Sequence, residues 1–180
     1  MTPNAGELAD RQFWFVGAYF DDREPQDQTG RFLADGIWEN GFEDRHLDLV
    51  KSMQPGDRIA IKASYTRKQG LPFDSRNHLV STMLLKAIGT VKHNRGDGRT
   101  VEVEWVPFDQ AREWYFFTGR STVWKVTPSD WKRRALISFA FNDEPQDLDK
   151  FAMIPSGPNA SEIMILRLCK TSAGQPSMRT

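Results

Sequence analysis

The stretch MQPGDRIAIKAS, from Met53 to Ser64, decides the fold class of this 180-residue chain. Gln54 to Asp57 places proline and glycine before aspartate, a combination that ends a helix and turns the chain. Arg58 to Ala63 then alternates in character from one residue to the next, as a partly buried β-strand does. The stretch therefore predicts the end of a helix followed at once by a strand.

The N-terminal side supplies the expected helix and another strand. Apolar side chains recur at three-residue spacing within Glu43 to Met53, which predicts a short amphipathic helix. The aromatic run QFWFVGAYF, Gln12 to Phe20, predicts a buried strand, and Asp21 to Gly30 predicts a loop.

The C-terminal side predicts further strands joined by turns. A basic loop is expected over Tyr65 to His78, and the turn Asn94 to Gly98 predicts a hairpin. Ser129 is the expected N-cap of a helix, and Gln146 to Ala152 predicts one or two helical turns. Further strands are expected at Met83–Lys92, Arg99–Val106, Glu113–Thr118 and Ser121–Val126. This order predicts an α+β fold in which roughly five or six strands, mostly antiparallel, curl into a small barrel-like sheet with peripheral helices.

The composition of the chain changes near Pro155, where SGPNAS is typical of a linker. We expect one domain over residues 1–155 and a linker or flexible tail over residues 156–180.

Composition excludes several classes of protein. Lys and Arg number 24, as do Asp and Glu, so the net charge is zero and a uniformly basic nucleic-acid-binding protein is excluded. The sequence contains no run of about 18 apolar residues, which a membrane-spanning helix would need, and its first residues lack the pattern of a signal peptide. The single cysteine, Cys169, excludes an internal disulfide, and the three histidines show no zinc-ligand spacing. We expect a cytoplasmic protein without metal or cofactor.

The neutral total hides an uneven distribution of charge. Residues 21–57 hold ten acids against four Lys or Arg, residues 58–99 hold nine Lys or Arg against two acids, and residues 112–134 hold six against two. Ordinary solvated surface accounts for this pattern as well as a phosphate-binding face does. On the functional interpretation, the predicted phosphate contacts are Lys62, Arg67, Lys68, Arg76 and Arg120.

Motifs for catalysis are missing from the sequence. It has no Walker-type phosphate loop, no dinucleotide fingerprint and no nucleophile elbow. We therefore expect a binding domain and no enzymatic activity.

Aromatic residues near polar and basic ones are the main functional signal. Trp38 stands in the glycine-flanked stretch GIWENG, expected to be a loop, while Asn40 and Ser64 offer an amide and a hydroxyl. A nucleobase turned out of a helix needs a ring to stack on and polar groups to read its edge. We predict that these three residues line a base-binding pocket, with Tyr65 and Trp114 as further candidates. The alternative interpretation is that the aromatic residues belong to the core.

The order of the motifs resembles the EVE family of the PUA-like superfamily. The matching positions are Trp38, Asn40, Gly56-Asp57, Ser64 and Ala87-Ile88-Gly89. The chain departs from the EVE pattern just before the serine, where Lys-Ala replaces the usual aromatic residue and histidine. From Gln12 to Phe151 it also resembles the N-terminal reader domain of McrB-type, modification-dependent restriction ATPases of the AAA class, on stretches that include GDRIAIKASYTRK, KAIGTV and REWYFFTGRSTVW.

The resemblance implies a domain that recognises a modified base in double-stranded DNA by flipping it into an aromatic pocket. It also implies an AAA-type ATPase and a nuclease, fused or associated, as the partners that carry the catalysis. Two alternatives stay open: an RNA-binding PUA-like module, and a protein-interaction domain with no nucleic-acid role.

Overall fold

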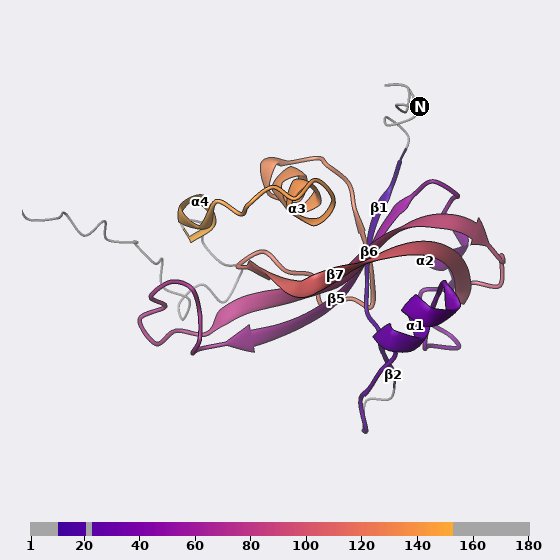
Figure 1. Ribbon diagram of the computed structural model, residues 1–180, viewed down its shortest axis with the longest axis horizontal. Coiled ribbons are helices and arrows are strands. Elements are labelled where there is room, and N and C mark those ends of the chain that lie inside the picture. The colour runs from indigo at the N-terminus through magenta and orange to yellow at the C-terminus, as the bar shows by residue number, and fades with distance from the viewer. Residues whose placement is uncertain (1–10, 21–22, 153–180) are drawn as a thin grey trace, which may run out of the picture.

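The computed structural model describes residues 11–20 and 23–152, which form a curled sheet with short helices around it (Figure 1). The strands of the main sheet are β1 (Phe13–Val16), β4 (Ile37–Glu39), β5 (Arg58–Arg67), β6 (Val80–Asn94), β7 (Thr100–Tyr115) and β8 (Val123–Val126). A separate small pair joins β2 (Tyr19–Phe20) to β3 (Gln26–Asp27). The helices are α1 (Thr29–Asp35), α2 (Leu47–Lys51), α3 (Trp131–Phe141) and α4 (Leu148–Ala152).

The six-stranded sheet runs in the order β4-β7-β6-β5-β1-β8, and all of its pairs but one are antiparallel. The exception is β1 beside β5, where Phe13 lies opposite Arg58. The long β6–β7 hairpin curls, so that the sheet forms a half-barrel (Figure 1). The predicted α+β class and the curled, mostly antiparallel sheet are confirmed.

The Gly56-Asp57 turn before β5 also fixes β1. The Asp57 side chain is buried, and its Oδ2 accepts hydrogen bonds from the Trp14 indole N–H at 2.8 Å and the Gln54 backbone N–H at 3.0 Å. Its other oxygen accepts the backbone N–H of Gln12 at 3.1 Å. One carboxylate therefore satisfies three donors and holds β1 beside the start of β5.

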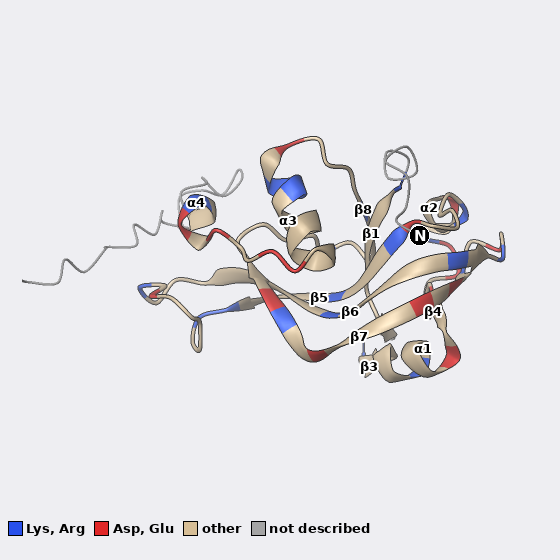
Figure 2. Ribbon diagram, turned by 45° about the horizontal axis from the view of Figure 1, so that its top comes forward, with Lys and Arg blue, Asp and Glu red and all other residues tan. Residues whose placement is uncertain are grey.

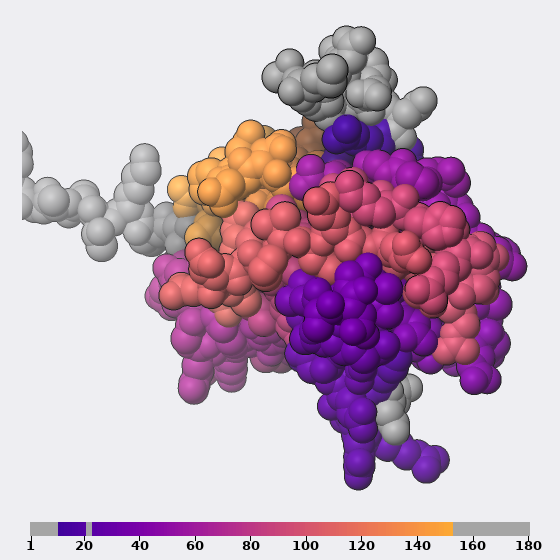
Figure 3. Space-filling view, turned by 45° about the vertical axis from the view of Figure 1, so that its right-hand side comes forward, coloured from indigo at the N-terminus to yellow at the C-terminus, as the bar shows by residue number. Residues whose placement is uncertain are grey.

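Apolar side chains fill both faces of the sheet. Phe32 of α1 and Val50 of α2 pack with Trp14 and Trp38 on the inner face of the curl. α3 and α4 cover the other face, where their side chains pack against Phe15, Ala60 and Met83. In the space-filling view α1 lies beside β7 (Figure 3). A hydrogen bond joins the two elements, because the Val103 N–H of β7 donates to the carbonyl of Gly36, the C-cap residue of α1.

Strand β5 changes register at a bulge between Ile61 and Lys62. Its pairing with β1 ends at Ile61, whereas its pairing with β6 continues to Arg67. We call the resulting projection, residues 62–85, the β5–β6 arm, and Figure 1 shows it extending at one end of the molecule.

Several elements differ from the sequence-based expectation because tertiary pairing overrides local pattern. The expected strand Gln12–Phe20 breaks at Gly17, whose N–H donates to the Thr122 carbonyl at 2.8 Å. The expected strands Arg99–Val106 and Glu113–Thr118 are parts of the single strand β7, since both pair with β6.

Helix ends differ as well. Asp130, and not Ser129, is the N-cap of α3, because its carboxylate accepts the Arg133 backbone N–H at 3.0 Å. The helix expected over Glu43–Met53 is only the five-residue α2. The predicted boundary near Pro155 lies outside the described residues. No helix in residues 11–20 and 23–152 is long and apolar enough to cross a membrane.

Candidate nucleic-acid interface

Trp38 lies in the core. It is the middle residue of β4, pairs with Val101, and has 0% of its surface exposed. Its indole N–H donates a 2.8 Å hydrogen bond to the Gly17 carbonyl. The expectation of a loop residue partly open to a cavity is wrong, because pairing with β7 turns the GIWENG stretch into a strand that faces the core.

Asn40 is buried too, and its amide organises its own loop. The side-chain nitrogen donates to the Arg45 carbonyl at 2.6 Å, and the side-chain oxygen accepts the Phe42 N–H at 3.2 Å. The polar groups that this residue was expected to offer a base are therefore used within the protein.

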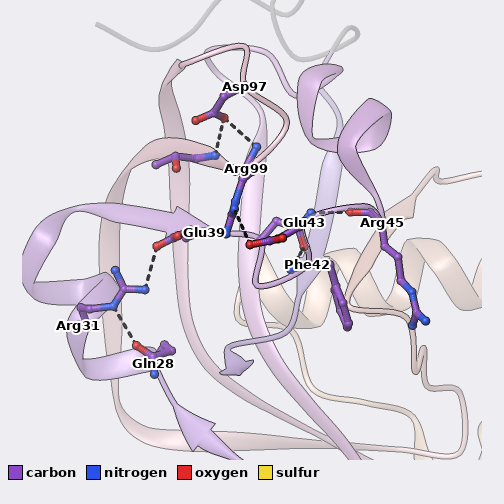
Figure 4. Close-up of polar contacts among 10 residues, drawn as sticks. Gln28, Arg31, Glu39, Phe42, Glu43, Arg45, Asp97 and Arg99 are labelled. Carbon is purple, nitrogen blue, oxygen red and sulfur yellow. Dashed lines mark hydrogen bonds and ion pairs between the residues drawn. The ribbon is translucent and has the colours of Figure 1, made fainter. Parts of the chain in front are cut away.

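Acids neutralise most of the cations near this loop. Figure 4 shows Glu39 between Arg31 and Arg99, at 3.0 and 3.8 Å. Along the β6–β7 hairpin, Lys92 pairs with Glu104 at 2.6 Å, and a further pair joins Arg95 to Glu102 at 3.5 Å. This end of the molecule thus balances its positive charge internally.

Trp114 is the second predicted pocket residue that lies in the core. Its ring packs 5.0 Å from Phe139 of α3 and 4.8 Å from Phe151 of α4, measured between ring centroids. Its indole N–H donates to the Phe117 carbonyl at 2.7 Å, and 0% of its surface is exposed. Trp114 therefore anchors α3 and α4 to the sheet.

Ser64 and Tyr65 lie on opposite faces of β5, since consecutive side chains of a strand alternate. Ser64 pairs with Met83 on the face that α3 covers, and its hydroxyl donates to the Gly119 carbonyl at 2.7 Å. Tyr65 pairs with Thr82, and 37% of its surface is exposed. The five predicted pocket residues thus do not converge on one cavity in this structure.

Tyr65 belongs to a polar network centred on Glu113. Arg67 donates to both carboxylate oxygens of Glu113, at 2.5 and 2.7 Å, and the Tyr65 hydroxyl donates at 3.3 Å. The Tyr115 hydroxyl also donates to this carboxylate. Burial alone would raise the pKa of Glu113, but the hydrogen bonds from Tyr115 and Arg67 outweigh it and the pKa is lowered. Glu113 is therefore ionised at neutral pH and neutralises Arg67.

Lys62 is buried, with 3% of its surface exposed. Its ammonium donates to the carbonyls of Gly119 at 2.8 Å and Ser121 at 2.7 Å. Burial lowers the pKa of Lys62 from 10.5 to about 8. In this conformation Lys62 pins the loop of residues 116–121 (the 116–121 loop) to β5, and its ammonium is not presented to a phosphate.

The remaining predicted phosphate contacts, Lys68, Arg76 and Arg120, are exposed. Arg120 follows Gly119 in the 116–121 loop, so it lies next to the base of the β5–β6 arm. Within the part of the chain that the structure describes, Lys68 and Arg120 have no carboxylate partner.

Arg76 has an unusual backbone conformation at the tip of the arm. Arg76 and Asn77 have φ values of 47° and 64°, and the His78 N–H donates to the Ser75 carbonyl at 2.9 Å, which closes a tight turn. Glycine and asparagine favour such positions, whereas a residue like arginine costs about 1–3 kcal/mol there. The turn therefore exposes the Arg76 side chain to solvent in spite of this unfavourable backbone conformation.

Glu113 is the residue that the sequence reasoning missed. Alternation along Arg112–Tyr115 places it on the same face as Tyr115, but nothing local indicates that Arg67, 46 positions earlier, lies opposite. Only the β5–β6–β7 register brings the two charges together.

In the described residues, no three His, Cys, Asp or Glu side chains gather as metal ligands. A search of protein-family models and of curated proteins found no match to this chain.

Proposed function

We propose that this domain binds nucleic acid through the β5–β6 arm and reads a modified base in double-stranded DNA. The observation that carries the proposal is the exposed side chain of Tyr65, with Lys68, which has no carboxylate partner among the described residues, three residues further along the same segment. An aromatic face beside cations is the arrangement that stacks bases and holds phosphates.

In this proposal the base stacks on Tyr65, and not on Trp38 as the sequence suggested. Tyr65 is the most exposed aromatic residue among the predicted pocket residues, whereas Trp38 and Trp114 are buried and support the sheet from within. The assignment of a modified base in DNA, and of a PUA-like architecture, is supported by the motif order that resembles EVE and McrB-type reader domains. Stacking on one ring gives modest affinity, so a fused or associated AAA-type ATPase would strengthen binding through avidity.

A panel of labelled oligonucleotides tests the function by fluorescence anisotropy at low salt. The panel holds an unmodified DNA duplex, duplexes of the same sequence with 5-methylcytosine, 5-hydroxymethylcytosine or N6-methyladenine, and the corresponding RNA. We expect tighter binding to one modified duplex than to the unmodified one. Preference for the RNA would favour the RNA-binding alternative, and no binding to any oligonucleotide would contradict the proposal.

Three variants locate the site. Tyr65→Ala is expected to remove about 1–3 kcal/mol of binding to the preferred duplex, and Tyr65→Phe, which keeps the ring, is expected to retain it. Lys68→Ala should weaken modified and unmodified duplexes alike, because phosphate contacts carry no base information. An unchanged preference in Tyr65→Ala would place the reading site elsewhere.

A further inference from the structure

Arg11 and Arg58 lie where β1 begins beside β5. The Arg58 backbone N–H donates to the Gln12 carbonyl at 2.9 Å, and Phe13 lies opposite Arg58 in the parallel pair. Phe13 packs with the core on the α3 side of the sheet, so Arg58 lies on that face, and alternation along the chain places Arg11 there too. Figure 2 shows Lys or Arg in blue at the start of β5, beside β1.

The Arg58 guanidinium is half-buried, but its donors are not used within the domain. Its carbon lies 5.1 Å from the centre of the Phe141 ring at the end of α3, and that ring lies 5.5 Å from the Phe13 ring, measured between centroids. Its Nε is buried without a hydrogen-bond partner, and its other two nitrogens donate to none of the described residues. Buried donors in proteins are nearly always satisfied, so the Arg58 fork is available to an acceptor from outside the domain.

Within residues 11–20 and 23–152, no carboxylate neutralises this pair of arginines. Neither Arg11 nor Arg58 forms an ion pair there, whereas Arg67 and Arg112 each pair with an acid. Glu144, exposed after the end of α3, pairs with neither. Burial and the neighbouring Arg11 lower the pKa of Arg58, and no acid offsets them. An anion shared by the two guanidiniums would relieve their repulsion.

Acids on the adjoining elements have other partners. The Asp57 carboxylate, next to Arg58 in the chain, satisfies three donors in the turn before β5. Asp143, which follows α3, pairs with Arg112 at 3.2 Å. Glu104 on β7 pairs with Lys92 at 2.6 Å. The positive charge of the two arginines is therefore not balanced by these neighbours.

We propose that Arg11 and Arg58 form a binding site for the phosphate group of a phosphomonoester, held beside the Phe141 ring. Guanidinium forks match the oxygens of a phosphate and bind it through charge-assisted hydrogen bonds. Two positive charges match a phosphomonoester, which carries a charge of about −1.5 to −2 at neutral pH, better than they match a carboxylate with a single charge. The site is independent of the proposed function, because Arg58 lies on the face of β5 opposite Tyr65.

Phosphorus NMR of inorganic phosphate, titrated with the full chain at neutral pH and fixed ionic strength, tests the site. The wild-type protein is expected to shift and broaden the resonance in a saturable way. Arg11→Gln and Arg58→Gln should each bind phosphate about tenfold more weakly, because each loses charge-assisted hydrogen bonds. Arg95→Gln removes the same charge from the β6–β7 hairpin, where Arg95 pairs with Glu102, and should bind phosphate as wild type does. Acetate, with its single charge, should compete only weakly.

Three results would overturn the site: no saturable change with wild type, an equal loss of affinity in Arg95→Gln, or acetate binding as tight as that of phosphate. Circular dichroism checks the fold of each variant. If Arg58→Gln does not fold, Arg58→Lys replaces it, since it keeps the charge beside Phe141 and removes the fork, and it should also weaken phosphate binding.

A second comparison identifies the source of the phosphate group. Anisotropy compares one DNA duplex with and without a 5′-terminal phosphate. A preference for the phosphorylated duplex that Arg11→Gln removes assigns the site to a nucleic-acid end, whereas equal affinity, together with binding of inorganic phosphate, assigns it to a small phosphomonoester. Phosphate binding by a protein that binds no duplex would leave this site standing and contradict only the proposed function.

Discussion

The indole N–H of Trp14 donates a 2.8 Å hydrogen bond to the carboxylate of Asp57, 43 residues later in the chain. This bond joins the first strand to the turn that precedes β5, at the parallel pair of the sheet. The Gly-Asp motif that the sequence singles out therefore has a structural role here.

Asp57→Ala is expected to destabilise the domain by about 3 kcal/mol. The substitution leaves the Trp14 indole and the backbone N–H groups of Gln12 and Gln54 without their acceptor, and buried donors without partners are costly. Urea unfolding followed by tryptophan fluorescence measures the change. Asp109→Ala, at an exposed position of β7, is the control and should leave stability near wild type. Equal midpoints for the two variants would contradict the anchoring role.

Trp38→Ala is expected to destabilise the fold by about 3–5 kcal/mol, the usual cost of truncating a large buried side chain. Trp38→Phe should cost less, since it keeps most of the volume and loses the bond to the Gly17 carbonyl. Chemical denaturation of both variants measures the difference. A Trp38→Ala protein as stable as wild type would show that this side chain is not part of the core.

Lys62 should make stability depend on pH above neutrality. Its pKa is about 8 in the folded protein and 10.5 in the unfolded chain, so the unfolded state binds more protons between these values. Stability relative to a Lys62→Met variant should therefore be constant below pH 8 and rise as the pH increases towards 10.5. The full rise is about 3 kcal/mol at most. Urea midpoints of both proteins across this pH range test it, and a difference that falls with pH would contradict the buried ammonium.

Glu113→Gln is expected to strengthen duplex binding if the β5–β6 arm holds DNA. The substitution removes the negative charge that neutralises Arg67, so the arm gains net positive charge and the salt slope should steepen by about 0.9. The same change should lower stability by about 1 kcal/mol, because a neutral amide accepts weaker hydrogen bonds from Arg67 and Tyr115.

Glu104→Gln is the matched control, since it frees Lys92 on the β6–β7 hairpin by the same change of charge. It should leave the slope at the wild-type value. Anisotropy titrations at several KCl concentrations compare the two, and a wild-type slope in Glu113→Gln would place the DNA away from the arm.

The candidate site shows where sequence reasoning holds and where it fails. Alternation along β5 indicates by itself that Ser64 and Tyr65 face opposite sides of the sheet. The sequence alone therefore argues against placing both residues in one pocket. The burial of Trp38, in contrast, is not indicated by the sequence, because GIWENG has the composition of a loop and becomes a strand only by pairing with β7, where Trp38 lies opposite Val101. The same holds for the pair of Arg67 and Glu113, which depends on the register of three strands.

The sequence by itself determined the α+β class, strand β5 after the Gly56-Asp57 turn, and the β6–β7 hairpin around Asn94 to Gly98. Periodicity and turn chemistry act over a few neighbouring residues, so they can be read without a structure. Tertiary structure alone decided which tryptophans are core, which cations are paired, and that Lys62 is buried beneath the 116–121 loop. These properties depend on contacts between segments far apart in the chain, and local sequence does not encode which segments meet.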